Sequence, residues 1–408
     1  MKLEVKELKE FYENGQLKIE TILINGKKNG SYTAFYDNGQ VKIKTNFFND
    51  SIVGEYKEYY ENGNILTDTY IFETQDYLFP DLSKKTELKF YGKTHTEYYK
   101  NKNIKIQIGK PELRSYQEFY ENGQLKLSTQ INNDFLIVGI HKYFGNYESF
   151  YDNGQLEIKT SYESSIINGL YEEYYENGTL KIKANYNKGS LNGTYEEFFA
   201  NGNLKILKQP TGEKSNCGFN SDKGGFFYFT EYYENGKIKI KSVLKECVTI
   251  MARKTKGVKN IYYKSEWVYE GPYEEYYSNG KLKIVTQHEY HGIFGVYKEY
   301  YINGKIKIET EYGKFGKEGN YLEHFKSGKL KVKTVYFNDL INGEFKKYYK
   351  NGQIKINANY IITRESISDG HIPIYKTDNI KDGLYEEYSK DGHLKINTLY
   401  SNGLEINE

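Results

Sequence analysis

The sequence contains few of the residues that characterise several common protein classes. Its 408 residues include two cysteines, five prolines, two methionines and one tryptophan. Two cysteines cannot form a disulfide framework, and neither Cys217 nor Cys247 lies in a C-x-x-C pair, so we expect two ordinary thiols. No stretch approaches about 18 consecutive apolar residues, which excludes a membrane-spanning helix.

An excess of charge of either sign is also lacking. Lys and Arg number 57 and Asp and Glu 55, which leaves a net charge of +2. This balance argues against a nucleic-acid partner and predicts little attraction to anionic membranes. The first residues, MKLEVKELKEFYENG, contain no apolar signal region, so we expect a cytoplasmic protein. A surface location is the alternative if an upstream signal was removed.

What the chain does have is aromatic residues, glycine and an internal repeat. Tyr accounts for 45 residues, Phe for 22 and Gly for 38, so the chain has enough apolar surface to exclude disorder. Asn-Gly recurs between aromatic and aliphatic runs, most often 24 residues apart, in eleven copies, and three degenerate copies bring the total to fourteen. The degenerate copies centre on Lys102, Gly328 and Gly392.

Each copy reads as a β-hairpin. Asn-Gly between apolar runs is the strongest short-range hairpin signal, because both residues tolerate the positive φ of a tight turn. Glu recurs five residues before the turn glycine and Lys three after it, as in Glu173 and Lys181. A two-residue loop would place this Glu opposite the aliphatic residue four after the glycine. A three-residue loop with a bulged glycine would place it opposite the Lys, and Ser149 facing Glu157 favours that register, whereas Lys347 facing Lys355 does not.

The repeat predicts one continuous array over residues 1–408. We expect an all-β, elongated, single-layer antiparallel meander of about fourteen hairpin repeats of 24 residues. A second glycine nine residues before the first, such as Gly169, is expected to turn the chain into the next hairpin. Lys102 replaces the turn glycine in its copy, so that turn should be distorted. Irregular insertions interrupt the 24-residue period near residues 70–90, 209–225, 245–268 and 359–380. Two interpretations are open: the insertions carry functional specificity, or they are surface loops that the scaffold tolerates.

No catalytic or metal constellation stands out, and we expect a non-enzymatic protein without cofactors. The recurring Glu spreads along the array, as a solvated Glu–Lys ladder would, rather than forming one pair of differently tuned acids. His288 and His291 lie three residues apart in HEYH, and on a strand such residues face opposite sides, which disfavours zinc. The less favoured enzyme alternative places a site around Cys217, Cys247 and Trp267.

The paired aromatics before each turn predict a protein-binding surface. Tyr offers a large rigid contact area and a hydroxyl at low entropy cost. Neighbouring strand residues face opposite sides, so one aromatic of each pair packs the sheet and the other is available for contact. The candidate contact residues, from regular copies, are Glu173, Tyr174, Tyr175, Glu275, Tyr276, Glu299 and Tyr300.

Segments such as GLYEEYYENGTLKIKANY (169–186) and GTYEEFFANGNLKI (193–206) resemble the MORN repeat, and more closely its bacterial variant found in putative toxin–antitoxin antitoxin components. The resemblance implies an elongated antiparallel meander that serves as an interaction scaffold. We therefore expect a protein-binding scaffold with a protein partner, and the finer expectation is an antitoxin or immunity protein that masks a toxin. The alternative is a spacer protein that acts at a surface or in host interaction.

Overall fold

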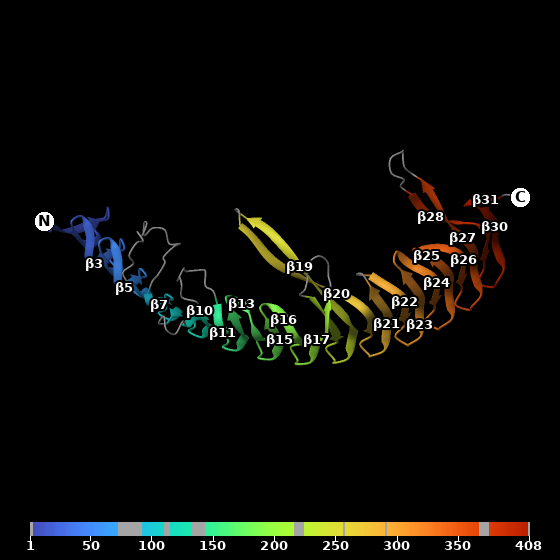
Figure 1. Ribbon diagram of the computed structural model, residues 1–408, viewed down its shortest axis with the longest axis horizontal. Coiled ribbons are helices and arrows are strands. Elements are labelled where there is room, and N and C mark those ends of the chain that lie inside the picture. Colours follow the sequence, from blue (N-terminus) through green and yellow to red (C-terminus); the bar gives the residue numbers. More distant parts are fainter. Residues whose placement is uncertain are drawn as a thin grey trace. The chain divides into compact units, whose positions relative to one another are not determined.

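The chain folds into β-strands that pair with one another in chain order. The computed structural model describes residues 3–71, 92–109, 115–131, 143–215, 224–255, 258–289, 292–366 and 375–406. Within these ranges there are 31 strands and no helix, so no described helix could cross a membrane (Figure 1). All the strands belong to one open antiparallel sheet. The predicted all-β hairpin meander is confirmed.

The chain divides into two compact units, Met1–Gly202 and Asn203–Glu408. The strands of the first unit are β1 (Val5–Phe11), β2 (Leu17–Ile24), β3 (Lys27–Phe35), β4 (Val41–Phe48), β5 (Ser51–Tyr59), β6 (Ile65–Ile71), β7 (Gly92–Tyr98), β8 (Ile104–Ile108), β9 (Ser115–Phe119), β10 (Leu125–Ile131), β11 (Tyr143–Phe150), β12 (Leu156–Glu163), β13 (Ile166–Ile167), β14 (Gly169–Tyr174), β15 (Leu180–Asn187) and β16 (Ser190–Phe198).

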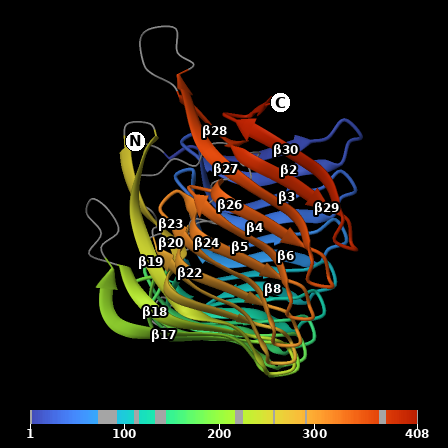
Figure 2. The same cartoon turned by 90° about the vertical axis from the view of Figure 1, so that its right-hand side faces the viewer.

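The second unit has the same hairpin order (Figure 2). Its strands are β17 (Leu204–Ser215), β18 (Gly224–Tyr232), β19 (Ile238–Thr255), β20 (Val258–Tyr276), β21 (Leu282–Glu289), β22 (Gly292–Tyr300), β23 (Ile306–Gly313), β24 (Gly316–His324), β25 (Leu330–Phe337), β26 (Leu340–Tyr348), β27 (Ile354–Ser366), β28 (Tyr375–Lys381), β29 (Gly383–Tyr388), β30 (Leu394–Ser401) and β31 (Leu404–Ile406).

The Asn-Gly turns are three-residue loops with a left-handed glycine. In the β14–β15 hairpin, the Tyr175 amide donates to the Thr179 carbonyl and the Gly178 amide donates to the Tyr175 carbonyl, each at 2.8 Å. Gly178 has a φ of 80°, and the Asn177 side chain accepts from the Thr179 amide at 2.9 Å. This is the bulged-glycine loop of the two alternatives. Lys102 adopts the same turn, with a φ of 77° and the same two hydrogen bonds, so the expected distortion is absent.

The connections between hairpins lie elsewhere than predicted. Gly169 is not a turn residue, because it pairs with Tyr186 inside the sheet. The chain instead reverses at two-residue turns such as Lys188-Gly189, where both residues have positive φ, at 49° and 81°. Asn187 and Ser190 pair across this turn. A turn in which both residues have positive φ matches the twist of the flanking strands. The sequence contains no signal for this turn, because lysine is not a residue that usually adopts positive φ.

One face of the sheet carries most of the buried side chains, and we call it the aromatic face. In the β14–β15 hairpin it is formed by Tyr171, Glu173, Ile182, Ala184 and Tyr186, from the register of the two strands. Ala184 is 2% exposed, and a small side chain recurs six residues after the turn glycine, as in Thr310 and Thr334. The small residue leaves room for two rings on either side of it. Tyr171 and Tyr186 meet edge to face with centroids 6.0 Å apart.

These two aromatic rows were not predicted from the sequence, although they recur in most copies. The same edge-to-face contact joins Tyr297 to Tyr312 and Tyr321 to Tyr336, at 5.7 and 5.4 Å. Each such ring pair stabilises the fold by about 0.5–1.5 kcal/mol beyond the contribution of the apolar area that it buries. Because the rings of one hairpin also meet the next strand, the core is distributed along the array rather than gathered at one centre.

Most of the predicted irregular insertions continue as regular strands. Residues 245–255 belong to β19 and residues 258–268 to β20, and the two strands pair from Thr255↔Val258 down to Ile240↔Glu275. Residues 209–215 extend β17, and 359–366 and 375–380 lie in β27 and β28. These strands extend past the shorter strands beside them (Figures 1 and 2). The insertion near 70–90 lies almost wholly outside the described residues.

The turn geometry predicts opposite effects for two substitutions. Lys102→Gly should stabilise the protein by about 1 kcal/mol, because a side chain in the left-handed region costs about that much. Gly178→Val should destabilise it by about 1–3 kcal/mol. Urea unfolding measures both, with Lys100→Gly in the same turn as the control that gains nothing. Equal unfolding midpoints for all variants would contradict the assigned turn positions.

Candidate binding surface

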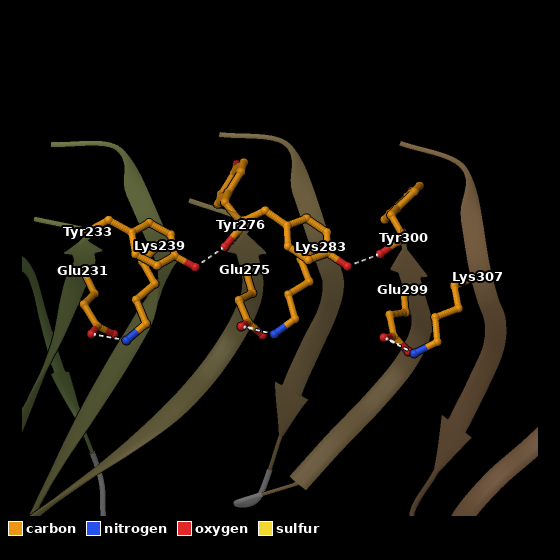
Figure 3. Close-up of polar contacts among 10 residues, drawn as sticks. Glu231, Tyr233, Lys239, Glu275, Tyr276, Lys283, Glu299, Tyr300 and Lys307 are labelled. Carbon is orange, nitrogen blue, oxygen red and sulfur yellow. Dashed lines mark hydrogen bonds and ion pairs between the residues drawn. The ribbon is translucent and has the colours of Figure 1, made fainter. Parts of the chain in front are cut away.

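The recurring Glu and Lys form ion pairs on the aromatic face. Glu173 pairs in register with Ile182 and Tyr174 with Leu180, so Lys181 is the extra residue of a bulge. The bulge turns Lys181 toward the face of Glu173, and its Nζ lies 2.6 Å from the Glu173 Oε1. The predicted contact between Glu and Lys side chains thus forms. The backbone pairing of Glu173 with the aliphatic Ile182, however, is the one expected for a two-residue loop. In the second unit the same pair joins Glu231 to Lys239, Glu275 to Lys283 and Glu299 to Lys307, at 2.6–2.7 Å (Figure 3). It also joins Glu323 to Lys331 at 2.6 Å.

The second aromatic before each turn binds the next hairpin through its hydroxyl. Tyr233 donates to the Tyr276 carbonyl and Tyr277 to the Tyr300 carbonyl, each at 2.8 Å (Figure 3). Tyr175 donates to the Phe198 carbonyl at 2.8 Å. We call this contact the inter-hairpin tyrosine bond. It also forms from Tyr12, Tyr36, Tyr60, Tyr99, Tyr120, Tyr151, Tyr301 and Tyr349.

Asparagine adds a second bond between consecutive turns. The Asn177 side-chain amide donates to the Ala200 carbonyl at 3.3 Å, and Asn303 donates to Lys326 at 2.9 Å. The same asparagine therefore shapes its own turn and contacts the next one. Phe199 and Phe325 stand where other copies have the bonding tyrosine, and both lack the hydroxyl. The asparagine contact does not depend on that hydroxyl.

The first aromatic before each turn lies on the opposite face, which we call the charged face. The Tyr276 hydroxyl donates to the Glu274 carboxylate of its own strand at 2.6 Å, and Tyr174 donates to Glu172 at 3.3 Å. These rings therefore bond within their own hairpin. Burial, with Glu274 beside it, raises the pKa of Tyr276 to about 12. The row runs through both units, with Tyr300 and Tyr348 among its members.

Charges alternate beside this row in the first unit. Glu148 pairs with Lys159, Lys159 with Glu172 and Glu172 with Lys183 across successive strands, and Lys183 pairs with Glu196. Of these four pairs, only Glu148 and Lys159 form an ion pair, with 3.4 Å between the Lys159 Nζ and the Glu148 carboxylate. Exposed ion pairs of this kind contribute little to stability. The main effect of the alternating Glu and Lys residues is to place opposite charges side by side on the charged face.

The seven predicted contact residues divide between the two faces. Glu173, Glu275 and Glu299 are held in ion pairs with a neighbouring Lys, and their side chains are 16–19% exposed. Tyr175 is used in an inter-hairpin bond. Tyr174, Tyr276 and Tyr300 lie on the charged face. Tyr276 and Tyr300 come from consecutive hairpins of the second unit, whereas Tyr174 belongs to the first unit.

Among the histidines and cysteines, Cys247 departs from the sequence expectation. His288 packs against the Tyr269 and Tyr273 rings, and burial lowers its pKa. His291 lies outside the described residues, and within those residues no group of His, Cys, Asp and Glu could hold a metal ion. Cys247 is disulfide-bonded, so the expectation of a free thiol there was wrong. The other cysteine of the chain, Cys217, lies outside the described part.

Comparison with protein families identifies the repeat. The family described as MORN repeat variant matches eleven segments that cover more than half of the chain. The segments are 4–25, 28–49, 52–70, 115–133, 145–164, 167–188, 191–209, 228–246, 269–289, 295–314 and 341–361. The chain belongs to the MORN repeat-variant family. Membership indicates a repeat scaffold for binding.

Comparisons of this MORN-variant chain with curated sequences and with solved structures show only low similarity. No curated protein sequence matches it. The solved structure of TcdB2-TccC3 is 8% identical and has a TM-score of 0.15, and the match covers 98% of this chain and 27% of that one. A porin-like protein from Bacteroides uniformis is 11% identical with a TM-score of 0.12, and the match covers 65% of this chain and 96% of that one.

The inter-hairpin tyrosine bond predicts a reciprocal pair of variants. Tyr277→Phe should lower the free energy of unfolding by about 0.5–1.5 kcal/mol, because it removes one hydrogen bond between MORN hairpins. Phe325→Tyr should raise it by a similar amount, because the new hydroxyl is placed to reach the Tyr348 carbonyl. Urea unfolding monitored by circular dichroism measures both. A loss of stability in both variants would contradict the assigned role of the hydroxyl.

The buried tyrosines predict unfolding at alkaline pH. Burial raises the pKa of Tyr276 and Tyr297 to about 12, and the ion pair with Glu275 raises the pKa of Lys283. Because the folded values lie above the unfolded ones, the stabilisation is complete below about pH 10 and lost as pH rises toward 12. Urea midpoints should stay level from pH 7 to 9 and then fall. A single tyrosinate titration at 295 nm with its midpoint near pH 10 in the folded protein would contradict this.

Proposed function

We propose that this chain is a non-enzymatic scaffold that binds a protein partner through the tyrosine row of its charged face. The observation that supports it most is that the two aromatic residues before each turn make different hydrogen bonds. The second one bonds to the next hairpin, as Tyr277 does to Tyr300. The hydroxyl of the first bonds within its own strand where Glu lies two residues before it, as Tyr276 does to Glu274. A partner could therefore contact this row without breaking a bond between hairpins.

The spacing of the row suits a partner that spans several hairpins. Each hairpin adds two strands, so successive rings are about 9.6 Å apart in the pairing direction. A tyrosine already held by a carboxylate loses little further entropy on binding. Single contacts of this kind are weak, and their sum over several hairpins supplies affinity and register.

The Glu residues among the predicted contacts have a supporting role in this proposal. Glu275 and Glu299 hold Lys283 and Lys307 beside the turn. Their pairing keeps the bulge in shape, and the bulge in turn sets the direction of the next residue on the strand. We keep Glu173, Glu275 and Glu299 as positioning residues and Tyr174, Tyr276 and Tyr300 as contact residues.

The finer identity that we favour is an antitoxin or immunity protein that masks a toxin in the cytoplasm. An extended row of aromatics supports this, because it can cover a partner's surface without any chemistry of its own. A spacer protein at the cell surface is the second candidate, and the disulfide at Cys247 favours it. Disulfides persist mainly in oxidising compartments and are rare in the cytosol.

Photo-crosslinking tests which face meets the partner. A photoreactive phenylalanine analogue in place of Tyr276 or Tyr300 keeps the ring, and other copies already have Phe there, as in Phe119 and Phe150. Irradiation in cells should give one adduct of defined mass from both positions. The matched control places the analogue at Tyr312, on the aromatic face, and should give none. Adducts from Tyr312 alone, or no adduct at any position, would contradict the proposed surface.

A further inference from the structure

The hairpin turns of each unit follow one another in a row, which we call the turn edge of that unit (Figure 1). Direct contacts join neighbouring turns. In the first unit the Asn153 side chain donates to the Glu176 carbonyl at 3.0 Å, and in the second Asn351 donates to the Lys390 carbonyl at 3.0 Å. Each hairpin adds two strands, so successive turns are about 9.6 Å apart in both units.

The turn edge of the first unit is acidic. From two residues before the turn glycine to one after it, its eight turns contain six acidic residues and two lysines, Lys100 and Lys102. All six acidic residues are exposed, and the ion pairs of the described residues involve other carboxylates. The six are Glu13, Asp37, Glu61, Glu121, Asp152 and Glu176.

The turn edge of the second unit is basic. In the same four positions its six turns contain seven lysines and two acidic residues, Glu234 and Asp391. All seven lysines are exposed, and within the described ranges the ion pairs involve other lysines. Three of the seven lie two residues before the glycine, namely Lys326, Lys350 and Lys390. The net charge of +2 for the whole chain conceals this separation of charge between the units.

The turn itself requires neither charge. Lys100 and Glu234 occupy the position of the other sign in their units, and both turns keep the same backbone hydrogen bonds. The Tyr99 amide donates to the Asn103 carbonyl at 2.8 Å, as the Tyr233 amide does to Lys237. Like charges about 9.6 Å apart repel each other at about 0.1 M salt, where the screening length is about 10 Å. A partner of opposite charge would relieve this repulsion.

We propose that the basic turn edge of the second unit binds the acidic turn edge of the first unit in a second copy of this chain. Both edges have a period of one hairpin, so an ion pair formed at one turn can recur at the next without a change of register. Three consecutive hairpins supply each set of charges, Lys326, Lys350 and Lys390 on one edge and Glu121, Asp152 and Glu176 on the other. Single exposed pairs are weak, and their sum over the row supplies affinity and orientation.

A second copy fits these edges better than another polyanion. Phosphates follow one another about every 3.4 Å along one strand of a DNA duplex, and side chains on one face of an extended peptide about every 6.8 Å. Neither spacing matches the period of the turns. A polyanion would also leave the acidic edge of the first unit unexplained, whereas a second copy accounts for both edges. The contact does not use the tyrosine row of the charged face.

Sedimentation velocity of the full chain tests the proposal with two charge-reversal variants. The basic-edge variant combines Lys326→Glu, Lys350→Glu and Lys390→Glu, and the acidic-edge variant combines Glu121→Lys, Asp152→Lys and Glu176→Lys. The wild type should associate at about 0.1 M salt and dissociate at about 1 M, where screening extends only about 3 Å. Each variant alone should associate at least about tenfold more weakly, because attractive pairs become repulsive. An equimolar mixture of the two variants should associate again, which also shows that both are folded.

The matched control reverses three exposed lysines at the connecting turns, Lys27, Lys188 and Lys314. Their change to Glu alters the net charge as much as the basic-edge variant does and should leave association unchanged. A wild type that stays a single chain at about 0.1 M salt, an equal loss in the control, or a mixture of variants that stays dissociated would overturn the proposal. Binding of a short DNA duplex without self-association would assign the basic edge to nucleic acid instead.

Discussion

The hydrogen bond from a tyrosine hydroxyl to a carbonyl of the next hairpin supplements the strand pairing that joins consecutive hairpins of the array. A hairpin of this length buries too little apolar surface to be stable alone, so each copy must gain stability from its neighbours. The bond from Tyr277 to Tyr300 does this next to the turn, where strand pairing has already ended. The turn asparagine adds a parallel contact, as from Asn303 to Lys326. Together they align consecutive turns.

This alignment determines what each face of the sheet can do. The bulge at Lys181 directs the lysine to Glu173 and leaves the residues around it in a fixed register. The aromatic face is then filled by ring pairs such as Tyr321 and Tyr336. The charged face receives the remaining aromatic of each copy beside paired charges. The regular period of the tyrosine row therefore follows from the packing of the scaffold, and the proposed binding surface needs no residues reserved for it.

Much of the fold could be predicted from the sequence because its signals are local. Asn-Gly and the 24-residue period were enough for the hairpins, and the Glu–Lys pairing followed from their recurrence. The connecting turn at Lys188-Gly189 could not be predicted, because Lys188 has a positive φ without a sequence signal, whereas the connecting turn at Asn25-Gly26 does carry one. The register could be predicted only in part: the three-residue loop and the Tyr174–Leu180 pair agree with the favoured alternative, whereas Glu173 pairs with Ile182 because the bulge at Lys181 adds a residue that no spacing reveals.

The candidate site was only partly predictable, because face assignment requires the register. Sequence alone could not tell which of Tyr276 and Tyr277 would bond to its neighbour, nor that the paired rows at Tyr297 and Tyr312 would fill the other face.

Hydrogen exchange of the Tyr277→Phe variant measures the coupling between hairpins most directly. If the inter-hairpin bond links nearest neighbours, backbone amides in the two hairpins that it joins, around residues 273–284 and 297–308, should exchange faster than in the wild type. Amides two hairpins away, around residues 345–356, should be unchanged. Unchanged exchange in the joined hairpins, or an equal increase throughout the second unit, would contradict the account.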